Sequence, residues 1–113
     1  TIAAAQMMTG SPIINAITDP QTIAGITYTN LSTKYDEFTT ISTHNPNFQE
    51  AVPGATVTNI TIQDGCSKDY SDHLTLPYNK RVWAMVLNAL AGEKVMEVPC
   101  LVAIPALRSI DAN

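Results

Sequence analysis

The longest regular pattern of apolar positions predicts one main helix over residues 78–91. Pro77 suits the first turn of a helix and Gly92 suits the position just past its end. From Val82 to the end of this range the only polar side chain is Asn88. One stripe of the helix holds Val82, Met85, Val86, Ala89 and Leu90, while Trp83 and Leu87 lie off it. A helix that is apolar on most sides is usually covered on most sides. We therefore expect it to pack against its own sheet and a neighbouring copy, or to be the central core helix of a monomer.

The remaining pattern favours short strands separated by turns. Residues rich in Thr, Val, Ile and aromatic side chains predict strands at 22–30, 38–43, 55–63, 95–100 and 101–110. Pro99 and Pro105 cannot donate to a sheet, so each is expected at an edge or a bulge. The chain therefore reads as a β-rich α+β protein, with a curled antiparallel sheet or small barrel of five or six strands beside one helix.

Residues 1–18 differ from the rest because they are rich in Ala, Met and Ile. Residues 2–8 have a helix-favouring composition, and Pro12 suits the start of a second helical turn. We expect an apolar N-terminal arm that packs on the domain formed by residues 19–113, or on a neighbouring copy. Because residues 1–17 lack the basic start of a signal peptide, we expect the sequence to be a mature form.

The composition excludes several classes of partner. Only 14% of the residues are charged, the formal net charge is −4, and the six basic residues are spread along the chain. Nucleic-acid binding is therefore not expected, because it needs a basic surface. A membrane-spanning segment is not expected either, because no apolar run reaches the length needed to cross a bilayer.

Two cysteines, Cys66 and Cys100, are either a disulfide or two free buried thiols. His44 and His73 do not stand at the spacing of a zinc finger, so a metal site is not expected. A disulfide indicates an oxidising compartment, and hence a secreted or periplasmic protein. Closing the loop between these cysteines would stabilise the fold by about 3 to 4 kcal/mol in the chain-entropy model.

The densest polar cluster is the loop of residues 63–73. It mixes carboxylates, an aromatic hydroxyl, an ammonium group and an imidazole, as sugar-binding sites do. The candidate glycan contacts are Lys68, Asp69, Tyr70, Asp72 and His73. Tyr35, flanked by Lys34 and Asp36, is a second candidate. The plain alternative is a solvated surface loop. A calcium site of Asp64, Asp69 and Asp72 is a further alternative, although it lacks the EF-hand spacing.

Catalysis is not expected, because no nucleophile can be identified beside either histidine. Thr1 as an N-terminal nucleophile would need a base and an oxyanion site that the sequence does not reveal. No cofactor is expected.

The order of strands, helix, cysteine-ending strand and closing strand resembles the binding subunits of cholera-like and pertussis-like two-part bacterial toxins. The matching stretches are Glu-Lys-Val-Met-Glu-Val-Pro-Cys at 93–100 and Pro-Ala-Leu-Arg-Ser-Ile-Asp-Ala-Asn at 105–113, with Asp-Pro-Gln-Thr-Ile at 19–23. The resemblance implies an oligonucleotide/oligosaccharide-binding (OB) barrel, assembly as a homo-oligomeric ring of five, and an enzymatic A subunit as partner. The sequence departs from that family in two ways: Cys100 has no N-terminal cysteine to pair with, and Leu101 and Val102 stand where a sugar-stacking aromatic is found.

These observations lead to one functional hypothesis and two alternatives. The hypothesis is a secreted, non-enzymatic glycan-binding subunit of a homo-oligomer, of the toxin B type. The first alternative is a structural or interaction subunit of a pilus, phage or surface assembly without a sugar site, and the apolar arm favours it. The second is a small secreted enzyme or inhibitor.

Overall fold

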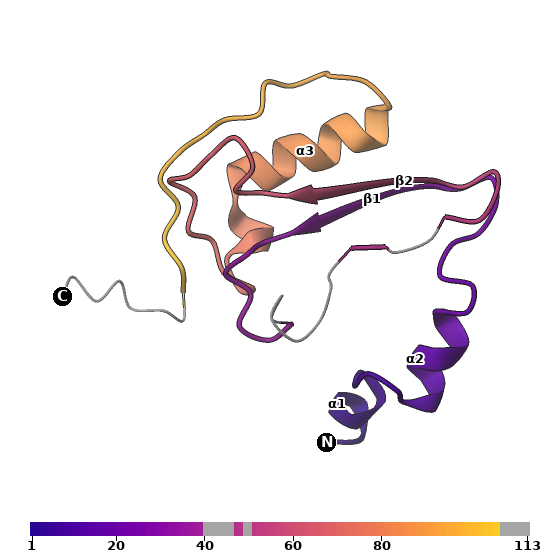
Figure 1. The fold of residues 1–113 in the computed structure, drawn as a ribbon. Coiled ribbons are helices and arrows are strands. Elements are labelled where there is room, and N and C mark those ends of the chain that lie inside the picture. The colour runs from indigo at the N-terminus through magenta and orange to yellow at the C-terminus, as the bar shows by residue number, and fades with distance from the viewer. Residues whose placement is uncertain (40–46, 49–50, 107–113) are drawn as a thin grey trace. The chain divides into compact units, whose positions relative to one another are not determined.

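A computed structural model describes residues 1–39, 47–48 and 51–106 of the 113-residue chain (Figure 1). Its elements are α1 (Ile2–Gln6), α2 (Pro12–Ile17), β1 (Thr27–Ser32), β2 (Thr56–Thr61), the 3₁₀ helix η1 (Leu76–Tyr78) and α3 (Lys80–Ala91). The predicted α+β class with one main helix is confirmed.

The chain forms two compact units. Unit 1 comprises Thr1–Tyr28 and Phe48–Thr58, and unit 2 comprises Thr29–Asn47 and Asn59–Asn113. Residues 18 and 19, between which the sequence suggested a boundary, both lie within unit 1.

Strands β1 and β2 pair in parallel, and both arrows point the same way in Figure 1. Near their starts the amide of Thr56 donates to the carbonyl of Ile26, and just past their ends the amide of Ile62 donates to that of Ser32. The predicted antiparallel sheet is therefore wrong, and the strands of the described residues do not close a barrel. Strand propensity locates a strand but not its direction, which is set by the long connection from β1 to β2.

The strands predicted after the helix do not form in the described part of the chain. The side-chain oxygen of Asn88 accepts hydrogen bonds from the amides of Val95 and Met96, which would otherwise serve a ladder. Ala103 makes only an isolated bridge with Asp69. The prediction for 38–43 also fails at residues 38–39, which are not in a strand, whereas residues 40–43 and 107–110 lie outside the described residues.

Helix α3 is bounded by local signals. The side chain of Asn79 caps its N-terminus by accepting from the amide of Arg81 at 2.7 Å, and Gly92 ends it with a φ of 72°. The cap at Gly92 is as predicted, because glycine tolerates this left-handed conformation. Pro77 instead belongs to η1, which precedes α3 as a separate turn.

The inward side of α3 differs from the predicted stripe. Arg81 and Ala84 are its buried residues, whereas Leu90 is 81% exposed. Trp83 and Leu87 are also exposed. The helix is therefore not the central core helix of a monomer in the part of the chain that the structure describes.

The interior of unit 2 is small and polar, and it is held by a disulfide and an arginine. Cys66 and Cys100 are bonded, which confirms the predicted bridge. The buried guanidinium of Arg81 donates to the carbonyls of Ile62 (2.8 Å), Asp64 (2.6 Å) and Pro99 (3.2 Å). The buried apolar residues of the described chain are only Ile62, Cys66 and Ala84. The disulfide and the hydrogen bonds of Arg81 therefore contribute much of the stability that a larger apolar core would otherwise supply.

Unit 1 carries the two N-terminal helices that the sequence suggested. The hydroxyl of Thr1 caps α1 by accepting from the amide of Ala4, and the hydroxyl of Ser11 caps α2 by accepting from the amide of Ile14. Neither helix has a buried residue. No helix among the described residues has the length and apolar content needed to cross a membrane.

Candidate functional site

Asp69 lies inside the polar loop rather than on its surface. Its carboxylate accepts hydrogen bonds from the amide of Ser71 (2.9 Å) and the side-chain amide of Asn79 (2.7 Å), and its side chain is buried. Because Asn79 also caps α3, Asp69 joins the loop to the start of the helix. Both carboxylate oxygens have partners within the protein, so the geometry gives Asp69 a positioning role.

Asp72 shapes the end of the same loop. Its carboxylate accepts from the amide and the hydroxyl of Thr75, and its own amide donates to the Thr75 hydroxyl at 2.8 Å. Its side chain is also buried. No group of three His, Cys, Asp or Glu side chains suited to a metal ion occurs within the described residues, so Asp64, Asp69 and Asp72 do not gather into a calcium site.

A buried network ties the loop to the segment that follows β1. The side-chain amide of Gln63 donates to the hydroxyl of Thr33 (2.9 Å) and to the carbonyl of Asp69 (3.2 Å), while its oxygen accepts from the amide of Lys34. The Thr33 hydroxyl donates to the carbonyl of Ser71 at 2.6 Å. These bonds hold residues 33–35 against residues 69–71.

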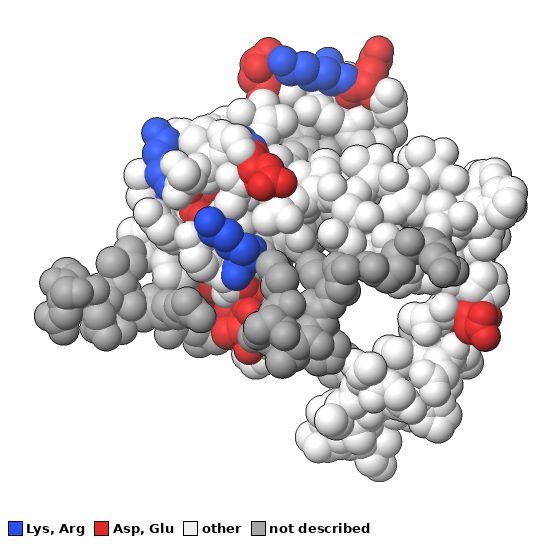
Figure 2. Space-filling model, in the orientation of Figure 1, with Lys and Arg blue, Asp and Glu red and all other residues white. Residues whose placement is uncertain are grey.

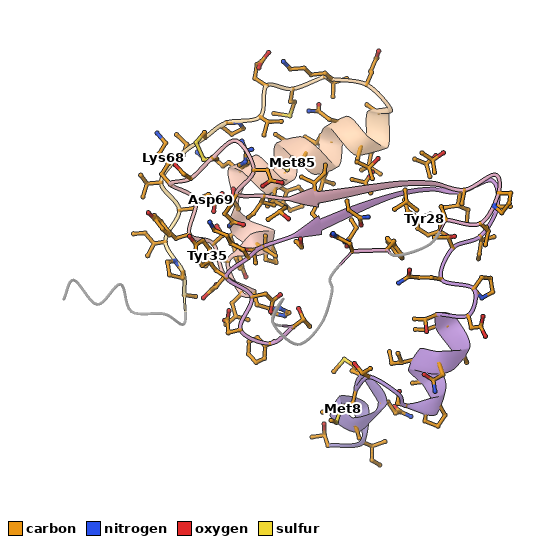
Figure 3. The ribbon with its side chains drawn as sticks, in the orientation of Figure 1. Met8, Tyr28, Tyr35, Lys68, Asp69 and Met85 are labelled. Carbon is orange, nitrogen blue, oxygen red and sulfur yellow. A yellow bond between two sulfur atoms is a disulfide. The ribbon has the colours of Figure 1, made fainter. Side chains whose placement is uncertain are left out.

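The consequence is a pair of tyrosine rings on the surface of unit 2. The rings of Tyr35 and Tyr70 lie 5.6 Å apart between centroids and are tilted by 40°, and Tyr70 is 43% exposed. The Lys34 ammonium lies 5.2 Å from the Tyr35 ring centre. Tyr35, Lys68 and Asp69 lie at the same end of unit 2, whereas Met85 lies on α3 (Figure 3). We call Tyr35 and Tyr70, with Lys34, the tyrosine face.

His73 adds a second group beside this segment. Its Nδ1 lies 2.9 Å from Oδ2 of Asp36, its ring meets that of Phe38 edge-on at 4.9 Å, and its amide donates to the carboxylate of Glu37. The structure thus brings together the two candidate regions of the sequence, Tyr35 and the 63–73 loop. Phe38 was not singled out for this site from the sequence, because an aromatic residue in a β-rich run reads as core packing.

The pKa of Asp36 departs from its ordinary value. Burial acts most strongly on it and raises its pKa, but hydrogen bonds from the amides of Thr39 and Phe38 and from His73 together outweigh burial. The pKa of Asp36 is therefore held below its ordinary value.

This lowered pKa predicts acid sensitivity. A carboxyl whose pKa is lower in the folded than in the unfolded state stabilises the fold fully above its unfolded value, and this stability is lost as the pH falls through the folded value. We expect the stability advantage of the natural chain over an Asp36→Asn variant to be constant near neutral pH. This advantage should shrink as the pH falls below 3.8, the ordinary pKa of the aspartate side chain, and vanish at lower pH. Urea unfolding of both proteins from pH 7 to pH 2 measures it, and a difference independent of pH would contradict the assignment.

A separate small pocket lies at the start of α3, with a volume of about 230 Å³. Its lining residues are Tyr78, Asn79, Lys80, Arg81, Pro99, Leu101, Val102 and Ala103. Pockets that enclose a drug-sized ligand are usually larger, from about 300 Å³ upwards. Leu101 and Val102, the residues that replace the expected sugar-stacking aromatic, give this pocket an apolar wall.

Comparison with known proteins adds no constraint on the site. The sequence matches no protein-family model and no curated protein.

Proposed function

We propose that this chain is a non-enzymatic glycan-binding subunit whose sugar contacts centre on the tyrosine face. The observation that carries the proposal is the ring pair of Tyr35 and Tyr70 with the Lys34 ammonium beside it. Aromatic rings offer an apolar surface to the C–H face of a sugar, while phenol hydroxyls and ammonium groups bond its hydroxyls.

The surroundings of the tyrosine face support binding without a large ordering cost. Gln63 and Thr33 hold both backbone segments, and the Cys66–Cys100 bond fixes the loop that carries Tyr70. A surface that is ordered before its ligand arrives loses less conformational entropy on binding. Lys68 and His73 are exposed and supply further hydrogen-bonding groups, whereas Asp69 and Asp72 act from within the loop.

The finer parts of the proposal are a secreted or periplasmic location and a toxin-B-like homo-oligomer that carries an enzymatic A subunit. The disulfide supports the location, because such bonds persist in oxidising compartments. The parallel pairing of β1 and β2 gives no support to an OB barrel or a ring of five, so these rest on the sequence resemblance alone.

The glycan proposal predicts that Tyr70→Ala weakens sugar binding about tenfold, because tyrosines are enriched among the residues that dominate binding energy, and a loss of about 1.4 kcal/mol is a factor of ten. A glycan array with sialylated and neutral sugars identifies the ligand, and titration calorimetry with that sugar gives the affinity of each variant.

Tyr78→Ala is the matched control for this experiment. Tyr78 is also an exposed tyrosine of unit 2, at 85%, but it lies in η1 and not on the tyrosine face. Equal losses in both variants, or no binding to any sugar, would contradict the proposal.

A second candidate is a structural or interaction subunit without a sugar site. The observation that favours it is the amount of apolar surface in unit 2, where Trp83, Leu90, Val95, Leu101, Val102 and Ile104 are all more than half exposed. In the view of Figure 2, residues other than Lys, Arg, Asp and Glu cover most of the described surface. Contiguous apolar surface commonly marks a protein interface. An array without hits, together with stable self-association, would favour this candidate.

A further inference from the structure

The outward side of α3 is an apolar stripe that no helix or strand of the described residues covers. Trp83, Leu87 and Leu90 recur at helical spacing, so they lie on one side of the helix, and they are 55%, 42% and 81% exposed. Val86 lies beside them and is half-buried. We call these four residues the outer face of α3.

Asn88, the polar side chain between Val82 and Ala91, does not relieve this exposure. Asn88 turns toward the chain that follows the helix, where it bonds the backbone of Val95 and Met96. Exposed faces of surface helices normally carry charged side chains. Between Lys80 and Glu93 the outer face has none.

The charges at the two ends of α3 are reversed relative to what a lone helix favours. Lys80 is the first residue of the helix, and Glu93 follows the glycine that ends it. A helix carries partial positive charge at its N-terminus and partial negative charge at its C-terminus, so both residues are unfavourably placed. Neither forms an ion pair with another described residue.

A second copy of the same helix, packed antiparallel, would both cover the outer face and compensate the charges at the two helix ends. Consider a two-fold axis centred between Val86 and Leu87. It sets Val86 opposite Leu87 of the second copy, and Trp83 opposite Leu90, at equal distances along the helix from the centre. The same register brings Lys80 to Glu93 of the other copy, and each charge then lies at the helix end that attracts it.

We propose that α3 is a homodimer interface, in which a second copy of this chain packs antiparallel on the outer face with a Lys80–Glu93 pair at each end. This interaction is distinct from glycan binding and does not depend on it. It forms a closed pair by two-fold symmetry, whereas a ring of five would use two different surfaces.

Sedimentation velocity of the full chain over a concentration series tests the interface. We expect a reversible monomer–dimer equilibrium. Leu87→Glu would place an unpaired charge at the centre of the interface in both copies, and we expect it to raise the dimer dissociation constant at least a hundredfold. Leu74→Glu is the matched control, because Leu74 is similarly exposed (45%) but lies outside α3.

A charge exchange tests the register even if Leu87→Glu disturbs folding. Lys80→Glu and Glu93→Lys should each weaken the dimer about tenfold, since each creates like-charge contacts at both ends of the interface. The double exchange should bind more tightly than either single variant, because opposite charges again meet at both ends of the interface, which a heterologous partner or a different face would not produce. A monomer at every concentration, an assembly unaffected by Leu87→Glu, or a double variant weaker than both single ones would each overturn the proposal.

Discussion

Removal of the disulfide by the double substitution Cys66→Ser and Cys100→Ser is expected to lower the free energy of unfolding of unit 2 by about 4 kcal/mol. In the chain-entropy model, a bond that joins residues 34 positions apart restricts the unfolded chain by about this amount. The total free energy of unfolding of a typical domain is only about 5 to 15 kcal/mol. Because the buried apolar core is so small, we expect the variant to be largely unfolded at 37 °C.

Urea unfolding followed through Trp83, the single tryptophan of the chain, measures this loss. Dithiothreitol should bring the natural protein to the stability of the double variant and leave that variant unchanged. Ser67→Ala, at an exposed neighbour of Cys66, is the control for local substitution. A loss below about 1 kcal/mol would show that other contacts hold the loop.

Replacement of Arg81 with methionine should lower the free energy of unfolding of unit 2 by about 3 kcal/mol or more. The reason is that each buried polar group left without a hydrogen-bond partner destabilises the folded state. The carbonyls of Ile62, Asp64 and Pro99 would all lose the same donor. Methionine has a long side chain of similar helix propensity. The loss of stability would therefore measure the missing hydrogen-bond donors rather than a change in side-chain volume.

Arg81→Lys should recover only part of this stability, since one ammonium cannot reproduce the planar set of donors of a guanidinium. Lys80→Met is the control, because Lys80 is exposed and its replacement should change the stability of the monomer by less than about 0.5 kcal/mol. An Arg81→Met variant as stable as this control would show that water replaces the donors without penalty.

The parts of the fold that were predictable from the sequence are those set by neighbouring residues. Pro12 at the start of α2 and Gly92 at the end of α3 act within one helical turn. The partner of Cys66 followed because the chain contains only one other cysteine. In contrast, the direction of β1 relative to β2 depends on residues far apart in the sequence, and strand propensity carries no information about it.

The candidate site was predictable in its residue types but not in their roles. Tyr35 and Tyr70 were both candidates, yet their contact depends on Gln63 and Thr33, which bond across 30 positions. Asp69 and Asp72 looked like surface groups because carboxylates are seldom fully buried. Their burial follows from donors such as Asn79 and Thr75, whose side-chain directions a sequence pattern does not reveal.

The long span of these hydrogen bonds also bears on how quickly the chain can fold. The bond from Thr33 to Ser71 joins residues 38 positions apart, and that from Lys34 to Gln63 joins residues 29 apart. Each such contact requires a long loop to close. The chain loses conformational entropy in closing it before the hydrogen bond can stabilise the fold, which makes folding slow. Arg81 reaches Ile62 over only 19 positions, so its contacts can form earlier. We infer that the arginine and its three carbonyls organise the loop first, and that the tyrosine face is completed late, when residues 33–35 arrive.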